Sequence, residues 1–355
     1  MNREIAMDLD LDAPLLLSVI VPARDEAESI RDCVASLVRQ SEEDFLLGKD
    51  WELIVVDDAS TDATKQIAQS FAAVQVLDAP PLESGWTGKA NALWFAARQA
   101  RGKWLLFTDA DTVHEPGSLR RAIHEAEKYH VALLSYSPRQ VVRGLAHRAL
   151  MPLIFADLAQ QYPTRLVNSS ESPLAAANGQ FLMIDRAVYR RLGGHAAVHS
   201  SIIEDLELAR RCKQSKAGLR FRYAPDAVST RMYRSFGAMY GGWLKNLAAL
   251  FPDALIRGAG KLVMTILLFG LPLVAIWLYL TVARTPVIWA VGLWWAWRLR
   301  VHYGRVAKAH FSALDTMLSP LGLPLFGWLL VASWMQKNIR HEVTWKGRSY
   351  PNEHR

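Results

Sequence analysis

Two aspartates separated by one alanine are the residues of this sequence whose types and spacing best suit chemistry. Asp109 and Asp111 follow an apolar run at 105–107, which predicts a strand. Side chains alternate between the faces of a strand, so we expect both carboxylates to project to the same side. Two like charges held so close are costly unless a cation lies beside them. Mg²⁺ or Mn²⁺ would suit the pair, together with waters and the phosphates of a substrate.

A helix cap is the simpler explanation for Asp111. Residues 115–118, Glu-Pro-Gly-Ser, already supply a start signal for the helix that follows. Asp111 is therefore not needed as a cap, although the pair taken alone leaves metal binding and a structural role both open.

Four short apolar runs alternate with segments of helical spacing and predict an α/β fold. The runs lie at 15–22, 53–56, 74–77 and 105–107. We expect Pro22 to end the first strand, and Ser60 with Thr61 to cap the helix after the second. Such an alternation predicts a right-handed, mainly parallel sheet. Ligands of these sheets bind beyond the carboxyl ends of the strands.

Polar residues gather at three of the predicted carboxyl ends. They are Pro22-Ala23-Arg24-Asp25-Glu26, Asp57-Asp58 and Asp109-Ala110-Asp111. A cap or a solvated turn explains any one cluster but explains all three poorly. Carboxylates accept hydrogen bonds from a uracil imide or from ribose hydroxyls, and Arg24 and Lys89 carry the charge that phosphate requires.

The ordered set of motifs resembles glycosyltransferase family 2. The resemblance covers residues 15–250 or so and rests on SVIVPARDE at 18–26, VVDDASTD at 55–62, GKAN at 88–91, DAD at 109–111 and IED at 203–205. It implies an A-type nucleotide-sugar-binding fold, a UDP- or GDP-activated donor, a divalent metal and inversion at the sugar carbon.

The resemblance also implies roles for individual residues. Pro22, Ala23 and Glu26 would line the base pocket, and Asp57 or Asp58 would contact the base or ribose. Asp109 and Asp111 would be the metal motif, with Lys89 near the diphosphate.

In this family the region around Gln180 forms the acceptor side of the pocket. Gln180 is either a polar residue beside a strand or a sugar contact. Glu204 and Asp205 would suit the first turn of any helix. The resemblance makes Asp205 the general base, which takes a proton from an acceptor hydroxyl.

The chain departs from the family after the base. Many members carry Gln/Arg-x-x-Arg-Trp, whereas residues 239–243 here keep only Trp243. Trp243 either stacks under an acceptor or anchors an amphipathic helix at a membrane surface. The missing arginine argues against processive polymer synthesis, and Arg231 or Arg234 is expected to supply the phosphate contact instead.

The carboxyl-terminal third predicts a membrane region. The chain is 51% hydrophobic with a net charge of +7, and no nucleic-acid-binding pattern is present. Residues 262–283 are long enough to span a bilayer. A second run at 286–297 precedes basic residues, which favour the cytoplasmic side. We therefore expect a hairpin over 262–297, and a re-entrant or bent hairpin over 311–335 because prolines and glycines interrupt that stretch.

Other segments are expected to contact lipid or substrate. Residues 145–158 and 243–250 resemble interfacial helices. The tail at 343–350 resembles the closing segment of ceramide, carotenoid and hopanoid-type glycosyltransferases, in which case Lys346 and Arg348 would hold the diphosphate. Binding of this basic tail to anionic lipid is the alternative.

The complete prediction is a membrane-bound inverting glycosyltransferase that moves one sugar, preferably glucose from UDP-glucose, to a lipid. Its segments are an extension (1–14), a cytosolic catalytic domain (15–234), an interfacial helix and linker (235–260), a transmembrane or re-entrant region (261–336) and a basic tail (337–355). We place it in the plasma membrane or the bacterial inner membrane, as a multi-pass protein. The alternatives are a polyprenyl-phosphate sugar transferase and a catalytically inactive membrane scaffold. The sequence does not predict an oligomeric state.

Overall fold

The computed structural model describes residues 15–281, 286–340, 342–345 and 348–351. The expected extension at 1–14 and Lys346 lie outside the described residues. The chain divides into two compact units, one formed by the described residues up to 139 together with 165–230, and the other by 140–164 and the described residues from 231 onward.

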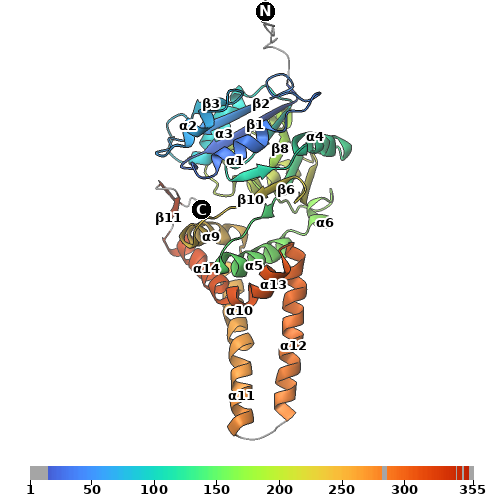
Figure 1. Cartoon of the computed structure of the whole chain (residues 1–355), viewed down its shortest axis with the longest axis vertical. Helices are drawn as coiled ribbons and strands as arrows, with labels where there is room; N and C mark the ends of the chain where they lie inside the picture. Colours follow the sequence, from blue (N-terminus) through green and yellow to red (C-terminus); the bar gives the residue numbers. More distant parts are fainter. Residues whose placement is uncertain (1–14, 282–285, 341, 346–347, 352–355) are drawn as a thin grey trace, which may run out of the picture. The chain divides into compact units, whose positions relative to one another are not determined.

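A seven-stranded sheet forms the centre of the first unit (Figure 1), in the order β3-β2-β1-β4-β8-β6-β9. The strands are β1 (Leu17–Ala23), β2 (Trp51–Asp57), β3 (Gln75–Asp78), β4 (Trp104–Phe107), β6 (Leu133–Ser137), β8 (Leu182–Asp185) and β9 (Leu219–Tyr223). Only β8 runs antiparallel to its neighbours in this sheet. The prediction of a mainly parallel sheet is confirmed.

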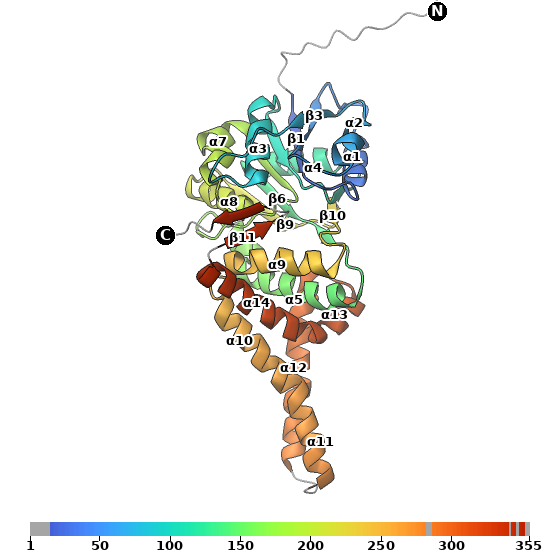
Figure 2. The same cartoon turned by 90° about the vertical axis from the view of Figure 1, so that its left-hand side faces the viewer.

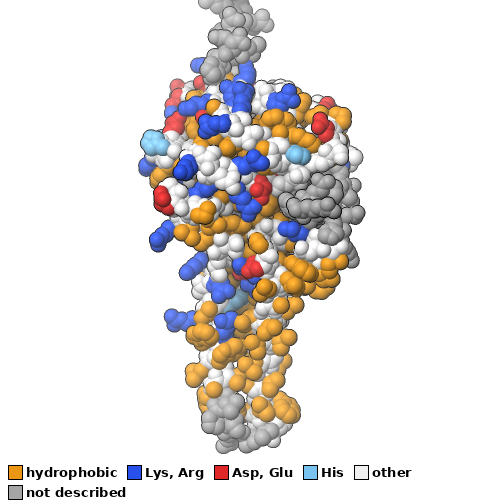
Figure 3. All heavy atoms as spheres, turned by 180° about the vertical axis from the view of Figure 1, so that it is seen from behind, with side chains coloured by type: hydrophobic (Ala, Val, Ile, Leu, Met, Phe, Trp, Pro, Cys, Tyr) orange, Lys and Arg blue, Asp and Glu red, His pale blue; other side chains and the backbone are white. Residues whose placement is uncertain are grey.

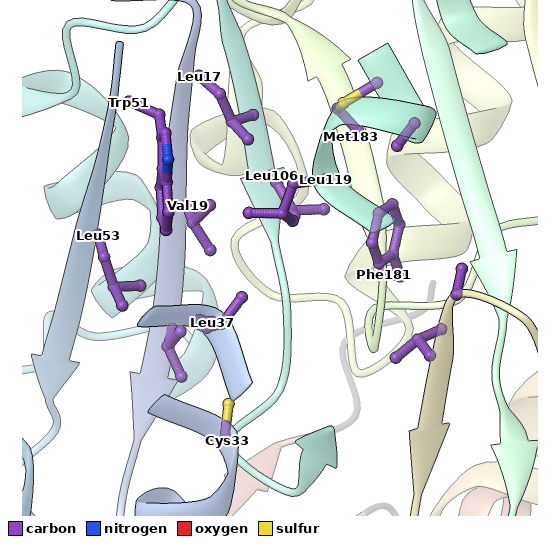
Figure 4. Close-up of a cluster of buried hydrophobic side chains, with 14 of the residues drawn as sticks. Leu17, Val19, Cys33, Leu37, Trp51, Leu53, Leu106, Leu119, Phe181 and Met183 are labelled. Carbon is purple, nitrogen blue, oxygen red and sulfur yellow. The ribbon is translucent and has the colours of Figure 1, made fainter. Parts of the chain in front are cut away.

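Helices cover the two faces of this sheet, so its central strands β1, β2 and β4 are buried along almost their whole length. The helices of the unit are α1 (Ile30–Val38), α2 (Thr64–Gln69), α3 (Gly88–Gln99), α4 (Ser118–Lys128), α6 (Thr164–Val167), α7 (Arg186–Arg191) and α8 (Glu204–Gln214), with the 3-10 helix η1 (Gly194–Val198). Figure 4 shows Cys33 and Leu37 of α1 on the same side of the sheet as Val19 and Leu106. Cys33 and Cys212 are buried free thiols.

Two details of the strands differ from the sequence prediction. Pro22 lies inside β1 rather than ending it. The pairing of β1 with β4 covers only Leu17–Ile20, so the missing N–H of proline removes no bond on that side. In addition, β4 ends at Phe107 and the short strand β5 (Thr112–His114) begins five residues later. Asp109 and Asp111 therefore lie in a turn, and the argument from strand alternation was wrong.

The remaining strands of the two units are short. They are β7 (Arg139–Gln140), β10 (Val228–Thr230), β11 (Glu342–Trp345) and β12 (Arg348–Pro351). β10 pairs antiparallel with β5, and β11 pairs antiparallel with β12 to form a hairpin in the tail.

Helices build the second unit. They are α5 (Leu145–Gln161), α9 (Phe236–Leu250), α10 (Ala254–Thr265), α11 (Leu271–Thr281), α12 (Pro286–Val306), α13 (Ala313–Leu318) and α14 (Leu323–Met335), with the π-helical segments η2 (Ile266–Gly270) and η5 (Gln336–Arg340) and the 3-10 helices η3 (Ala307–Ala309) and η4 (Ser319–Gly322). Residues 140–164, which the prediction placed in a continuous domain 15–234, belong to this unit. The reason is that the apolar side chains of α5 share one buried cluster with α9 and α14.

Two helical stretches of this unit are long and apolar enough to cross a membrane. They are Ala254–Thr281, with a mean hydropathy of 2.3, and Ala313–Ile339, with 1.5. The first belongs to a hairpin with α12, and α5, α9 and α14 lie across the long direction of that hairpin (Figures 1 and 2). α12 continues to Val306, nine residues beyond the predicted end at Trp297.

The segment 311–335, expected to form a re-entrant or bent hairpin, belongs from Ala313 onward to one continuous helical stretch, Ala313–Ile339. This segment is helical from Ala313 onward, and Pro320 and Pro324 occupy the first turns of η4 and α14. Proline is tolerated in a first turn because the N–H it lacks would have no helical partner there.

Candidate active site

The loops that follow β1 and β2 are joined by hydrogen bonds between side chains and backbone. Asp25 Oδ1 accepts from Thr61 N at 2.7 Å, and Asp25 N donates to Ser60 Oγ at 3.0 Å. Glu26 N donates to Thr64 Oγ1 at 2.7 Å. Ser60 and Thr61 therefore bind the neighbouring loop instead of capping α2, and that prediction was wrong. Asp25 has a positive φ of 51°, a conformation that is costly outside glycine and that the three hydrogen bonds stabilise.

Arg24 and Asp58 lie at the same loop junction. Arg24 Nη1 donates to the Asp58 carbonyl at 2.8 Å, and Asp58 N donates to the Ala23 carbonyl at 2.8 Å. Ala23 and Asp58 are buried. These contacts bring the predicted base-pocket residues of both loops together at one edge of the sheet.

Asp57 ends β2 as a buried carboxylate. Its Oδ2 accepts from Ser60 N at 3.1 Å. Its Oδ1 is buried and has no hydrogen-bond partner among the residues that the structure describes. A buried carboxylate oxygen without a partner costs free energy, and an N–H or hydroxyl of a bound base or ribose would remove that cost.

Lys89 connects the Asp109 turn to the start of α8. Its Nζ lies 2.8 Å from Asp109 Oδ1 and 2.9 Å from Glu204 Oε1. Thr87 Oγ1 caps α3 by accepting from Ala90 N, which places Lys89 in the first turn. Burial lowers the pKa of Lys89, but the carboxylates of Asp109, Glu204 and Asp205 outweigh it, so the pKa lies well above its usual value.

Asp111 is the second carboxylate of the turn. It forms no ion pair with a Lys or Arg side chain among the described residues. Its Oδ1 is buried without a hydrogen-bond partner in the described part of the chain. Burial, and then the charges of Asp109 and Glu26, raise the pKa of Asp111 to about 7. Burial and the neighbouring negative charges disfavour the ionised form of Asp111. A bound cation would therefore stabilise its carboxylate.

These residues fit a divalent ion held by two carboxylates and a substrate. No group of three or more His, Cys, Asp or Glu in the described ranges is arranged to hold a metal. Mg²⁺ and Mn²⁺ do not require one, because waters and substrate phosphates complete their coordination. Asp109 and Asp111 would supply the two carboxylates.

Asp205 lies in the first turn of α8 and is held by the backbone of another segment. Its Oδ2 accepts from Gly179 N at 2.7 Å, and its Oδ1 accepts from Leu206 N at 2.8 Å. A side chain at position 179 would meet Lys89, because its Cβ would lie 2.8 Å from Lys89 Nζ and 3.4 Å from Asp205 Oδ2. The base candidate, the lysine and the Asp109 carboxylate therefore lie close together.

The protonation of Asp205 differs from the expectation drawn from the helix dipole. Burial, and then the neighbouring Glu204, raise the pKa of Asp205 to about 6. The dipole alone would favour the carboxylate, but burial outweighs it. A pKa nearer to neutrality makes Asp205 a stronger base while leaving it mostly ionised at pH 7.

A buried network of hydroxyls supports the Asp109–Asp111 turn. Thr112 Oγ1 donates to the Asp109 carbonyl at 2.7 Å, and Thr230 Oγ1 donates to the Asp111 carbonyl at 3.2 Å. Gln180 Nε2 donates to Thr230 Oγ1 at 3.2 Å, while Gln180 Oε1 is buried with no partner among the described residues. Gln180 thus supports the turn and also retains one free acceptor.

The sequence analysis missed both threonines. Thr112 directly follows the Asp109–Asp111 motif and could have been suspected from that position. Thr230 is 119 residues from Asp111, and no local signal in the sequence indicates it.

The structure corrects the contact predicted for Trp243. Trp243 is 3% exposed, donates from Nε1 to Met151 Sδ and packs edge-on against Phe155 and Tyr233. It is a core residue of the second unit, so the predicted contact with a substrate is corrected. The side chain of Arg348, like all of Lys346, lies outside what the structure describes.

Comparisons with known proteins agree with this geometry. Residues 18–193 match the family "Glycosyl transferase family 2". The chain is 25% identical over 350 residues to a 4,4'-diaponeurosporenoate glycosyltransferase of Staphylococcus aureus strain USA300, covering 94% of this chain and 88% of the relative. The same enzyme from strain MRSA252 is 25% identical over 354 residues, with the same coverage.

A solved structure shows the same fold. A mannosyltransferase from Pyrobaculum calidifontis, in complex with GDP-Man and Mn²⁺, superposes with a TM-score of 0.55 at 18% identity, covering 92% of this chain and 90% of the other. The predicted A-type fold is confirmed. With the sheet, the acidic loops at its carboxyl edge and the family match taken together, the chain is a glycosyltransferase that carries a family 2 domain.

Proposed function

We propose that this glycosyltransferase moves a single sugar, with glucose as the first candidate, from a UDP-sugar to a membrane lipid, with inversion at the sugar carbon. The observation that carries the proposal is the cluster in which Lys89 joins Asp109 to Glu204 while Asp205 and Gly179 lie beside it. The closeness of the Asp109 carboxylate, the Lys89 ammonium and the Asp205 carboxylate supports a site that would hold a metal ion and a phosphate beside a general base.

Each of these residues would have its own role in the reaction. Asp57 and Glu26, at the carboxyl edge of the sheet, would bind the base or ribose. Asp109 and Asp111 would hold Mg²⁺ or Mn²⁺, which stabilises negative charge on a departing diphosphate. Asp205 would accept the proton of an acceptor hydroxyl as that oxygen attacks the anomeric carbon.

The acceptor class is supported by the relatives and by the second unit. The Staphylococcus aureus relatives are named for a carotenoid acid, so an apolar acceptor with a carboxylate or hydroxyl is the first candidate. The stretch Ala254–Thr281 is apolar and only 11% of its most hydrophobic window is buried. A hairpin that exposes so much apolar surface suits a bilayer, with the basic residues on the cytoplasmic side.

A polyprenyl-phosphate acceptor is the second candidate. Arg231 Nε is buried without a hydrogen-bond partner among the described residues, and a guanidinium suits a phosphate. Such an acceptor is already anionic and needs no base. In that case loss of Arg231 should abolish transfer, whereas loss of Asp205 should change it little.

Labelled UDP-sugars incubated with the purified protein and a total lipid extract test the proposal directly. We expect one labelled lipid, whose formation ceases when a chelator removes divalent ions. Transfer from GDP-sugars only, or product formation that is insensitive to the chelator, would contradict the proposal. Donor hydrolysis without any lipid product would contradict the lipid acceptor.

A further inference from the structure

His114 is a buried histidine beside the Asp109–Asp111 turn, and the reaction proposed above gives it no role. It ends β5 and is 3% exposed. Its Nε2 lies 3.0 Å from Thr108 Oγ1 and 3.4 Å from Thr112 Oγ1. Thr108 directly precedes Asp109, and Thr112 directly follows Asp111. One ring nitrogen therefore contacts the residues on both sides of the two carboxylates.

The two threonine hydroxyls use their protons on backbone carbonyls. Thr108 Oγ1 donates to the Gln180 carbonyl at 2.8 Å, and Thr112 Oγ1 donates to the Asp109 carbonyl at 2.7 Å. A hydroxyl has only one proton to donate, so each oxygen faces His114 as an acceptor. The two oxygens lie 2.9 Å apart, and a proton on His114 Nε2 that both oxygens share stabilises this close contact.

The polar ring of His114 has a cost that packing alone does not explain. Burial lowers the pKa of His114 to about 3, so the ring is neutral. Its Nδ1 is buried and has no hydrogen-bond partner in the described ranges. The ring packs against Phe181, with the ring centroids 5.7 Å apart. An apolar side chain would fill this space without leaving a buried polar atom unsatisfied, so the bond from Nε2 is what the histidine contributes.

The two threonines also hold the backbone of the turn. Thr112 N donates to the Asp109 carbonyl at 3.2 Å, the same carbonyl that its hydroxyl binds. Thr108 N donates to the Ile20 carbonyl of β1 at 3.1 Å. Rotation of either hydroxyl away from its carbonyl would remove a bond that fixes the backbone beside the turn. The directions of both carboxylates depend on that backbone.

We propose that His114 is a positioning residue for the metal motif: by donating to Thr108 and Thr112 it keeps both hydroxyls on their carbonyls and so fixes the directions of the Asp109 and Asp111 carboxylates. The inference rests on the proposed function, which includes the divalent ion. Partners that orient the ligands of a metal contribute about 10–100-fold to its affinity. His114 acts through one further residue, so we expect the lower end of that range, about 10-fold.

Two substitutions of similar shape separate the hydrogen bond from the packing. Gln can place an N–H near the position of the imidazole Nε2, whereas Met has a similar length and no donor. We expect His114→Met to weaken Mn²⁺ binding in the presence of saturating UDP by about 10-fold, and His114→Gln to stay within about 3-fold of wild type. Electron paramagnetic resonance of free Mn²⁺ measures this in purified protein.

Thr112→Val tests the path through the hydroxyl. Valine keeps the shape of threonine but cannot donate to the Asp109 carbonyl, so Mn²⁺ binding should weaken. Adding His114→Met to Thr112→Val should then cause a smaller loss than it causes alone, because residues of one hydrogen-bond network are not additive. Fully additive losses would overturn the inference. If His114→Met fails to fold, unchanged Mn²⁺ binding by Thr112→Val would overturn it alone.

His302→Met is the matched control. His302 Nε2 is hydrogen-bonded to the Ser319 hydroxyl at 2.8 Å, within the second unit. It lies on α12, and hydrophobic side chains cover most of the hairpin that contains this helix (Figure 3), so all variants are compared in the same detergent. We expect His302→Met to bind Mn²⁺ as wild type does. An equal loss in His302→Met and His114→Met would overturn a role specific to His114.

The remaining outcomes distinguish the inference from the proposed function. Unchanged Mn²⁺ affinity in His114→Met would overturn the inference alone. An equal loss in His114→Gln and His114→Met would assign His114 to packing and would also overturn it. Absence of Mn²⁺ binding by wild type in the presence of UDP would overturn the proposed metal site, and the inference with it.

Discussion

The ammonium of Lys89 lies 2.8 Å from Oδ1 of Asp109, so the lysine neutralises the first carboxylate of the Asp109–Asp111 turn and leaves the second without a cation. The same ammonium contacts Glu204 at the start of α8. One lysine therefore sets the charge of both the candidate metal motif and the candidate base.

Lys89→Met should shift the pH dependence of transfer. The lysine lowers the pKa of both Asp205 and Asp111, so its loss should raise both. We expect the acidic limb of the kcat/KM profile to move to higher pH, and turnover at pH 7 to fall. Steady-state kinetics between pH 5 and 9 would measure this.

Lys65→Met is the matched control for Lys89→Met. Lys65 forms an exposed ion pair with Asp78, and exposed pairs contribute little. A Lys89→Met enzyme with lower turnover but an unshifted profile would contradict an electrostatic role and leave only a binding role.

Asp111→Asn should abolish transfer while the protein remains folded. Loss of one of two metal-binding carboxylates should lower kcat by about 10³-fold or more, since metal-assisted charge stabilisation contributes several kcal/mol. Titration of Mn²⁺ in the presence of UDP should show binding to wild type and little to the variant. Retained metal binding with full activity would contradict the assignment.

The metal-free protein should respond to pH through the same residue. The pKa of Asp111 is about 7 in the folded protein, above its ordinary 3.8. The stabilising contribution of this carboxyl is therefore complete below pH 3.8 and is lost as pH rises through 7. In a chelator, thermal unfolding of wild type should shift down between pH 4 and 7 more than that of Asp111→Asn. Equal shifts would contradict the raised pKa.

The orientation in the membrane is a further prediction. We expect the first unit and the tail after Met335 to lie on the cytoplasmic side, because Arg298, Arg300 and Arg305 lie at the end of the hairpin towards which α12 runs. A tag fused after Arg355 should be protected from protease in sealed spheroplasts. Cleavage from outside would contradict an even number of crossings.

Gly179→Ala tests how closely the base and the lysine must approach. The added Cβ would lie 2.8 Å from Lys89 Nζ, the movable end of a flexible side chain. We therefore expect little change in the thermal unfolding temperature but a clear loss of kcat. Unchanged kcat would indicate that Lys89 can move away without consequence.

The sequence predicted β1, β2, β3 and β4 because each of these strands contains a short apolar run, as is usual for strands of a parallel sheet. It did not predict β6 and β9, in which polar side chains interrupt the apolar ones. It failed where a contact joins distant residues. Asp109 and Asp111 were placed on a strand that ends at Phe107, since apolar periodicity does not locate a turn. Trp243 was read as a surface residue because nothing local indicates its partner Met151, 92 residues away. Thr230 and the Lys89–Glu204 pair were missed for the same reason.

Asp205→Asn should slow the chemical step without weakening the binding of the UDP-sugar. The amide keeps an acceptor for Gly179 N but cannot take a proton. Positioned proton transfer contributes about 10²–10⁴-fold, so with a hydroxyl acceptor we expect kcat to fall by that range while UDP-sugar affinity changes by less than a few-fold. In wild type the rate should also decrease as pH falls through about 6, the pKa of Asp205, and this limb should be absent from the variant.

Glu207→Gln is the control for this substitution. Glu204 is unsuitable, because it holds Lys89 and its loss would alter the charge around Asp205. Glu207 lies one turn of the helix from Glu204 and pairs with Arg210 of the same helix. It therefore shares the helix start without contacting Lys89 in the described structure. Equal losses in Asp205→Asn and Glu207→Gln would assign both residues to helix stability. A near-normal rate for Asp205→Asn alone would instead indicate an acceptor that is already anionic, because a carboxylate or phosphate attacks the sugar carbon without losing a proton.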